Sequence, residues 1–380
     1  MSRRLLIATR KLAGLSGKVL LIQHNLPALV AAGWDAHVLA EKAERELLVS
    51  LGAQLHPAPR AWWLRSARLR RFSRRAEQLA LKVRADLVIG HGDTLQQDVL
   101  HLHLCPHRQH REITGEELQP GESPHADFTA EMLRARGFRR LIANSNLMRE
   151  EVIRRYAVPD SKISVVYPGY EPARFKPGAE PPSGELRTQL RVSPDGLLVG
   201  LITSGDFRTR AADQFLQAVA LLPPALRDRL TLLIVGKDSR TEQYRRLSAQ
   251  LKLEARTHFL SPRRDVEHIY RALDLYVHPA YFETFGMGVL EALACAVPVL
   301  ATRNTGVTEL YPSALQEWRL LRPDAQEIAA KMQMLLESPE TRRQLAAQAR
   351  AAIQHLTWAE NARRHLEIYE QVLADKRGSA

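Results

Sequence analysis

The stretch HPAYFETFGMGVLEA, residues 278–292, decides the fold of this chain. The apolar run 273–277 before it indicates a buried strand, and the apolar run 289–296, which Pro298 stops, indicates a helix. This order places the intervening loop outside the carboxyl end of a strand and at the amino end of a helix. Backbone N–H groups and the helix dipole favour an anion at such a place.

The loop also carries residues that suit a sugar. Gly286 and Gly288 allow a ligand to approach the backbone closely, and Glu283 and Glu291 can both face the same pocket mouth. Ionised carboxylates only accept hydrogen bonds, so they suit the paired hydroxyls of a sugar or ribose. Sugar and phosphate on one loop indicate a nucleotide sugar. A plain strand, loop and helix with two solvated glutamates is the alternative.

The Glu-x7-Glu spacing is followed by ALACAVPVLAT at residues 292–302 and later by Gly306 and Glu309. This pattern resembles the retaining glycosyltransferases of family four, and within them the bacterial lipopolysaccharide core glucosyltransferases that use UDP-glucose. The resemblance implies an α/β chain with the GT-B fold. In that fold two doubly wound, Rossmann-like domains face each other across a cleft, and a C-terminal helix crosses back to the first domain.

The bulk composition agrees with two globular domains. The chain has 380 residues, of which 45% are hydrophobic and 25% are charged. It contains no run of about 18 apolar residues and no signal-peptide pattern, so we expect a cytoplasmic protein. Cys105 and Cys295 lie far apart in sequence, which argues against a disulfide framework. A net charge of +12 indicates an anionic partner.

Proline and glycine place the domain boundary. Residues 178–184 have linker composition, so we expect an acceptor-binding domain at residues 1–178 and a nucleotide-sugar-binding domain at residues 185–357. The amphipathic segment from residue 358 to residue 380 is the helix that we expect to return to the first domain.

A second anion site is predicted near Arg210. A strand at 197–202 leads into the basic loop 203–210, and a helix follows. The resemblance implies that Arg210 and Arg208 hold the donor diphosphate and that the turn containing Arg263 reads the base. The catalytic residues that it implies here are Glu283, Arg208 and Arg210, and the donor-binding residues are Glu291, Phe285, Gly286, Met287, Arg263 and Gly205.

The first domain fits the family less closely. A loop with Gly14, Gly17 and Lys18 follows the first strand, and the resemblance implies that it lies beside the donor phosphates. A flexible turn is the alternative. The resemblance also offers Asp93 and His103 as catalytic candidates.

A further histidine, His107, is the candidate acceptor contact that the resemblance offers. Alternation puts His101, His103 and Cys105 on one strand face, but this spacing matches no standard zinc framework. We therefore expect no metal and no cofactor besides the nucleotide-sugar donor.

Residues 60–84 form a strongly basic segment with a single acid, Glu77, and begin near Trp62 and Trp63. Tryptophan beside a basic helix is typical of binding at an anionic membrane surface. A solvated helix whose arginines pair with acids elsewhere is the alternative. No aromatic stacking platform accompanies the charge, so nucleic acid is not expected as a partner.

The sequence therefore predicts an enzyme that moves a hexose, of the glucose type, from a UDP-sugar to a lipopolysaccharide core or another anionic glycan or glycolipid. We expect it in the cytoplasm or peripherally on the inner face of a bacterial inner membrane. Two alternatives remain at this point. One is a nucleotide-sugar epimerase on the same fold, and the other is a non-catalytic basic protein that binds membrane or nucleic acid.

Overall fold

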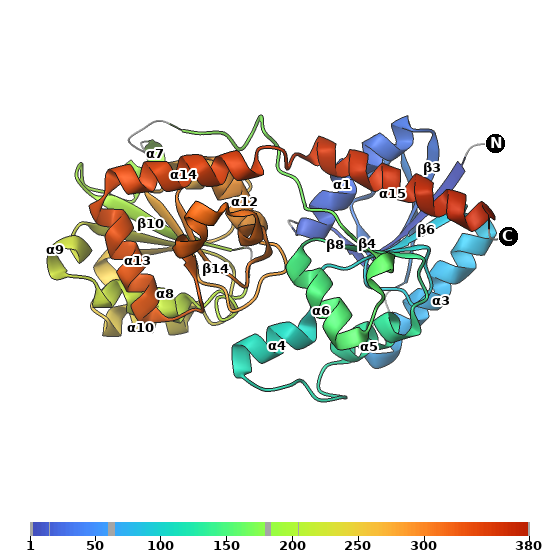
Figure 1. Cartoon of the computed structure of the whole chain (residues 1–380), viewed down its shortest axis with the longest axis horizontal. Coiled ribbons are helices and arrows are strands. Elements are labelled where there is room, and N and C mark those ends of the chain that lie inside the picture. Colours follow the sequence, from blue (N-terminus) through green and yellow to red (C-terminus); the bar gives the residue numbers. More distant parts are fainter. Residues whose placement is uncertain (1–2, 15, 60–64, 179–183, 204, 379–380) are drawn as a thin grey trace. The chain divides into compact units, whose positions relative to one another are not determined.

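The computed structural model describes residues 3–14, 16–59, 65–178, 184–203 and 205–378. The chain divides into two compact units, Met1–Gly169 with Leu356–Ala380, and Tyr170–His355 (Figure 1). The first unit thus ends before the predicted boundary at residue 178. The intervening segment belongs to the second unit because Arg174 forms an ion pair with Glu267 and Gly178 lies against the side chain of Arg271. Trp62 and Trp63 lie outside the described residues.

The first unit is built on a parallel sheet with the strand order β5-β3-β1-β6-β7-β8-β9 in the part of the chain described. The strands are β1 (Arg3–Ala8), β3 (Trp34–Ala40), β5 (Ala53–Pro57), β6 (Leu87–Gly90), β7 (Val99–His101), β8 (Arg140–Ala143) and β9 (Ile163–Val165). The chain first runs outward from β1 to β5 and then continues on the other side of β1 with β6. The strand order therefore switches direction between β1 and β6, where doubly wound sheets bind ligands.

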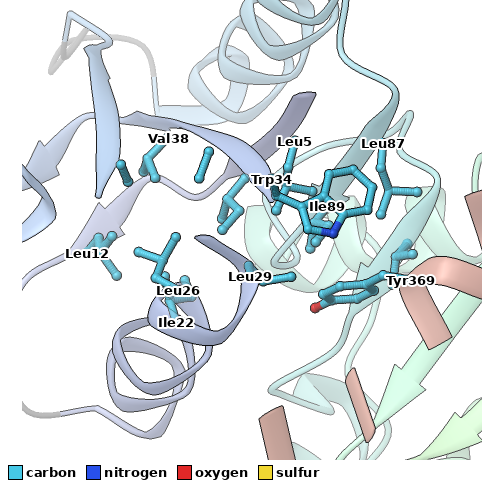
Figure 2. Close-up of a cluster of buried hydrophobic side chains, with 14 of the residues drawn as sticks. Leu5, Leu12, Ile22, Leu26, Leu29, Trp34, Val38, Leu87, Ile89 and Tyr369 are labelled. Carbon is cyan, nitrogen blue, oxygen red and sulfur yellow. The ribbon is translucent and has the colours of Figure 1, made fainter. Parts of the chain in front are cut away.

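Helices cover both faces of this sheet. They are α1 (Gly17–Ala31), α2 (Arg45–Ser50), α3 (Arg65–Val83), α4 (Pro106–Thr114), α5 (Pro124–Ala135), α6 (Asn146–Tyr156) and α15 (Trp358–Gly378). On one face, Leu5 of β1 packs in a cluster with Leu26 of α1 and Tyr369 of α15 (Figure 2). On the other face, Leu6 packs with Phe72 of α3. Burial on both sides explains why residues 5–8 of β1 are all apolar.

The C-terminal helix α15 packs on α1 and so belongs to the first unit, although the second unit precedes it in sequence. This confirms the predicted return of the chain. No helix in the described ranges is long and apolar enough to cross a membrane.

The second unit repeats this architecture. Within the described residues its parallel sheet has the order β12-β11-β10-β13-β14-β15. The strands are β10 (Leu197–Ile202), β11 (Leu230–Val235), β12 (Thr257–Leu260), β13 (Leu275–His278), β14 (Val299–Thr302) and β15 (Arg319–Leu320). The helices are α7 (Glu185–Gln189), α8 (Ala212–Leu221), α9 (Pro224–Arg227), α10 (Thr241–Gln250), α11 (Val266–Ala272), α12 (Met287–Ala294), α13 (Ala325–Glu337) and α14 (Pro339–Ile353). The direction switches between β10 and β13.

Candidate active site

The switch point of the second unit brings two predicted loops together. β10 ends at Ile202 and leads to the Arg210 loop, while β13 ends at His278 and leads to the Glu283 loop. The backbone N–H of Tyr281 donates to the carbonyl of Thr209 at 3.1 Å, which ties one loop to the other. The pairing of neighbouring parallel strands therefore places residues far apart in sequence at one edge of the sheet.

Arg210 and Glu283 form an ion pair at this edge, through guanidinium Nη2 and carboxylate Oε2. The two side chains are 20% and 21% exposed, so the pair is only partly solvated. Arg210 Nη1 also donates to Thr209 Oγ1 at 2.9 Å. An arriving phosphate would compete with Glu283 for the guanidinium, which can bind phosphate oxygens in a bidentate manner.

A buried histidine lies beside this ion pair. His278 Nε2 is 3.9 Å from Glu283 Oε2, and His278 Nδ1 is 2.8 Å from the hydroxyl oxygen of Tyr276. Burial and the nearby charge of Arg210 lower the pKa of His278 well below its usual value. No role for His278 or Tyr276 was predicted from the sequence. Their alternation along β13 was the available signal, because it places both side chains on one face of the strand.

The second predicted carboxylate, Glu291, lies on α12 and is half-buried. Its Oε2 accepts a hydrogen bond from the Tyr270 hydroxyl at 3.2 Å. Burial raises the pKa of Glu291 to about 7, although the hydrogen bond from Tyr270 acts in the opposite direction. Hydroxyl groups that donate to this carboxylate would favour its ionised form.

The two glycines between Glu283 and Glu291 lack room for a side chain for different structural reasons. Gly286 caps α12 with φ +97°, and a Cβ there would lie 2.6 Å from the Thr305 methyl carbon. A Cβ at Gly288 would lie 3.0 Å from the Tyr270 hydroxyl oxygen. No acidic side chain lies in the first turn of α12 and no side chain of the described residues caps it, so the terminus favours an anion.

Phe285 and Met287 flank Gly286 in different ways. Phe285 is buried and its carbonyl accepts from the N–H of Val307 at 2.7 Å, so its side chain belongs to the core. Met287 is the first residue of α12. The backbones of both residues lie at the helix terminus where the resemblance places the donor.

The other predicted basic groups are more exposed. Arg208 is exposed, and its guanidinium forms no ion pair with any described residue. Gly205, in the same loop, donates its N–H to Thr203 Oγ1 at 3.3 Å. Arg263 is engaged with Asp265 through contacts of 2.9 and 2.5 Å, and this pairing lowers the pKa of Asp265 to about 2. A base contact by Arg263 would therefore require exchange with Asp265.

In the first unit, Asp93 and Lys18 meet at the switch between β1 and β6. Asp93 is buried, and its Oδ2 lies 3.3 Å from Lys18 Nζ and 3.0 Å from the backbone N of Arg10. Gly17 begins α1, which Ser16 caps by accepting from Val19 N. Gly14 has φ +88°, so its conformation favours glycine.

The two predicted histidines of this unit lie in different surroundings. His103 Nε2 is 2.9 Å from His91 Nδ1, and burial together with the charge of Lys18 lowers the pKa of His103 to about 3. His107 lies on α4, where Nδ1 is 2.9 Å from the Tyr156 hydroxyl oxygen. The structure therefore relates His103 to the Lys18 and Asp93 cluster and places His107 with α6. Across the described ranges, no group of three His, Cys, Asp or Glu residues could hold a metal ion.

Comparison with known proteins assigns both halves of the chain. Residues 20–174 match the family described as Glycosyltransferase Family 4, and residues 201–352 match Glycosyl transferases group 1. A D-inositol 3-phosphate glycosyltransferase of Saccharomonospora viridis is 30% identical over 63% of this chain and 57% of its own length. The lipopolysaccharide glucosyltransferase WaaG of Escherichia coli K12 is 28% identical over 57% of this chain and 54% of its own length. The matches thus span little more than half of these relatives.

Solved structures match over almost the whole chain. The crystal structure of WaaG has a TM-score of 0.80 at 20% identity and covers 96% of this chain and 99% of that one. Anabaena HepE, in complex with UDP and glucose, has a TM-score of 0.78 at 20% identity, with 97% and 100% covered. These likenesses confirm the predicted GT-B fold. The chain belongs to the GT-B glycosyltransferases, with a family 4 region followed by a group 1 region.

Proposed function

We propose that this protein is a retaining glycosyltransferase that moves a hexose of the glucose type from a UDP-linked donor to an anionic glycan or glycolipid. The observation that carries the proposal is the Arg210–Glu283 pair at the switch point, with Glu291 on the adjoining helix. These groups supply a cation for a diphosphate and two acceptors for hydroxyls. The complex of HepE with UDP and glucose supports this class of donor.

Arg210 and Arg208 would offset the negative charge that develops on the leaving diphosphate, together with the amide groups at the start of α12. The bond between the anomeric carbon and the diphosphate oxygen breaks as the acceptor hydroxyl bonds to that carbon. The proton of the acceptor hydroxyl passes to the departing diphosphate. Glu283 would hold the transferred sugar and Glu291 the ribose.

Acceptor recognition would use the first unit, and charge favours an anionic acceptor. On α3, Arg68 and Arg70 pair with acids, but Arg71 and Arg74 are exposed and form no ion pair with any described residue. Leu81, farther along α3, is 80% exposed. Exposed cations and an exposed apolar side chain on the same helix support contact with an anionic membrane surface.

A transfer assay tests the proposal. Purified protein is incubated with UDP-glucose, with and without a lipopolysaccharide core acceptor, and UDP release and the linkage of the product are measured. Acceptor-dependent release with retention is the expected result. Conversion of the sugar without acceptor would indicate an epimerase, and failure of both UDP and UDP-glucose to shift the unfolding temperature would contradict a nucleotide-sugar donor.

A further inference from the structure

His278 has a ring nitrogen atom without a hydrogen-bond partner in the part of the chain that the structure describes. The residue ends β13 and is 3% exposed, and its Nε2 forms no hydrogen bond with any described residue. The ring is nevertheless held firmly, because its Nδ1 contacts Tyr276 at 2.8 Å. A buried polar atom without a partner is unfavourable, so such an atom next to a binding site points to a missing ligand group.

The hydrogen bonds of Tyr276 define which proton His278 carries. The Tyr276 hydroxyl donates to the carbonyl of Ile202 at 2.8 Å, and a carbonyl can only accept. Since a hydroxyl has one proton, the contact with His278 requires Nδ1–H to donate to the tyrosine oxygen. In a neutral ring, Nε2 then carries a lone pair and acts as an acceptor.

The neighbours of Nε2 select the chemistry of the missing group. Glu283 Oε2, 3.9 Å away, is also an acceptor, so the two atoms cannot bond to each other. Arg210, which pairs with Oε2, has a buried Nε that likewise lacks a partner among the described residues. A hydroxyl can donate to an acceptor and accept from a guanidinium at the same time. A phosphate oxygen would suit Arg210 but not His278.

We propose that His278 is a specificity residue of the donor site, where its Nε2 accepts a hydrogen bond from a hydroxyl of the transferred sugar beside Glu283. This inference rests on the proposed function. His278 Nε2 is buried and lies 3.9 Å from Glu283 Oε2, so we expect the hydroxyl to reach it after the diphosphate has drawn Arg210 away from Glu283. The site therefore selects sugars that keep this hydroxyl and discriminates against deoxy sugars.

The test compares UDP with UDP-glucose in His278→Asn. An asparagine amide keeps an N–H donor toward Tyr276 and removes the acceptor at the Nε2 position. We expect the dissociation constant for UDP to stay within about twofold and that for UDP-glucose to rise about tenfold. His258→Asn is the matched control, since His258 is half-buried near the amino end of β12, away from the site edge, and should change neither constant.

Deoxy donors separate a direct contact from a general disturbance. Wild-type protein should bind the UDP-deoxyglucose that lacks the contacting hydroxyl about tenfold more weakly than it binds UDP-glucose. For that donor, His278→Asn should cause no further loss of affinity. Equal weakening of UDP and UDP-glucose in His278→Asn would indicate a structural role and overturn the inference. Unchanged affinity for both ligands would also overturn it. Failure of the wild-type protein to bind either ligand would instead overturn the proposed function itself, and this inference with it.

Discussion

The two units present different chemistry at the switch points of their sheets. In the second unit, Arg210 and Glu283 meet as opposite charges, with neutral His278 behind them. In the first unit, buried imidazole rings stack on one another, with His101 4.7 Å from His91 and 4.9 Å from His365 between ring centres. Burial lowers the pKa of each of these three histidines, so they act as neutral hydrogen-bonding groups.

The two switch points should therefore recognise different chemical groups. A guanidinium beside a helix terminus compensates the charge of a diphosphate, and neutral imidazoles suit hydroxyl groups. At the switch point of the first unit, Lys18 and Asp93 form an ion pair, so each charge compensates the other. We therefore expect charge removal to be most damaging in the second unit and milder in the first.

Arg210→Ala should have the largest effect and would test the charged side of the comparison. Loss of the cation removes stabilisation of the leaving diphosphate and leaves Glu283 unpaired, so kcat should fall on the order of 10²- to 10³-fold. The measurement is the initial rate of UDP release in the presence of acceptor. Arg210→Lys, which keeps the charge, should recover part of the rate. A wild-type rate in Arg210→Ala would contradict the assignment of the site.

Glu291→Gln should weaken UDP binding by about 30-fold, because a carboxylate accepts stronger hydrogen bonds from ribose hydroxyls than an amide does. Titration calorimetry with UDP measures this change. Glu309→Gln serves as a matched control on the same unit and should bind UDP within about twofold of wild type. Equal losses in the two variants would show that charge, and not a ribose contact, determines affinity.

The pH dependence of UDP binding should follow Glu291. Its pKa is raised to about 7, so the carboxyl is mainly protonated at pH 6 and mainly ionised at pH 8. If the ionised form binds the ribose, affinity should rise roughly tenfold between these values. The folded protein holds this proton more tightly than the unfolded chain, so the contribution of Glu291 to unfolding free energy falls as pH rises from about 4.5 to about 7.

Glu291→Gln should flatten both of these profiles. Calorimetry at several pH values and urea unfolding at the same values are the measurements. An unchanged pH slope in this variant would assign the titration to another group.

Asp93→Asn should have the smallest effect of these changes and tests the charged contact of the first unit. An asparagine keeps an acceptor near Lys18 but loses the charge, so transfer to acceptor should fall about fivefold while UDP affinity remains unchanged. Asp160→Asn is the control in the same unit, because Asp160 pairs with Arg149 at the surface. Its transfer rate should stay within about twofold of wild type. A loss of UDP affinity in Asp93→Asn would remove the distinction between the two units.

Much of the fold could be predicted because it is encoded locally. Strand β10 coincides with the expected strand at 197–202, since continuous apolar runs between turn residues are typical of buried parallel strands. The prediction that α15 returns to the first unit came from the family resemblance and not from periodicity. Linker composition placed the predicted boundary at residue 178, and it does not reveal that Arg174 pairs with Glu267.

The candidate site was predictable only in part. Glu283, Glu291 and Arg210 were expected from their motifs, and the structure places them at one sheet edge in the second unit. His278 lies inside the same motif, but its orphan nitrogen became visible only with the hydrogen bonds of Tyr276. His103 and His107 of the first unit were predicted as site residues because they are histidines. The sequence did not indicate that His103 would contact His91, whereas His107 would contact Tyr156.

The sequence alone predicts a strand, a glycine loop and a helix, with carboxylates at residues 283 and 291. It also determined that a basic loop follows another strand at residue 210. Only the tertiary structure decided that β10 pairs with β13, so that Arg210 reaches Glu283 and Glu291 has a raised pKa. The physical reason is that hydrophobic patterning acts along the chain, whereas ion pairing, desolvation and the choice of tautomer depend on neighbours in space.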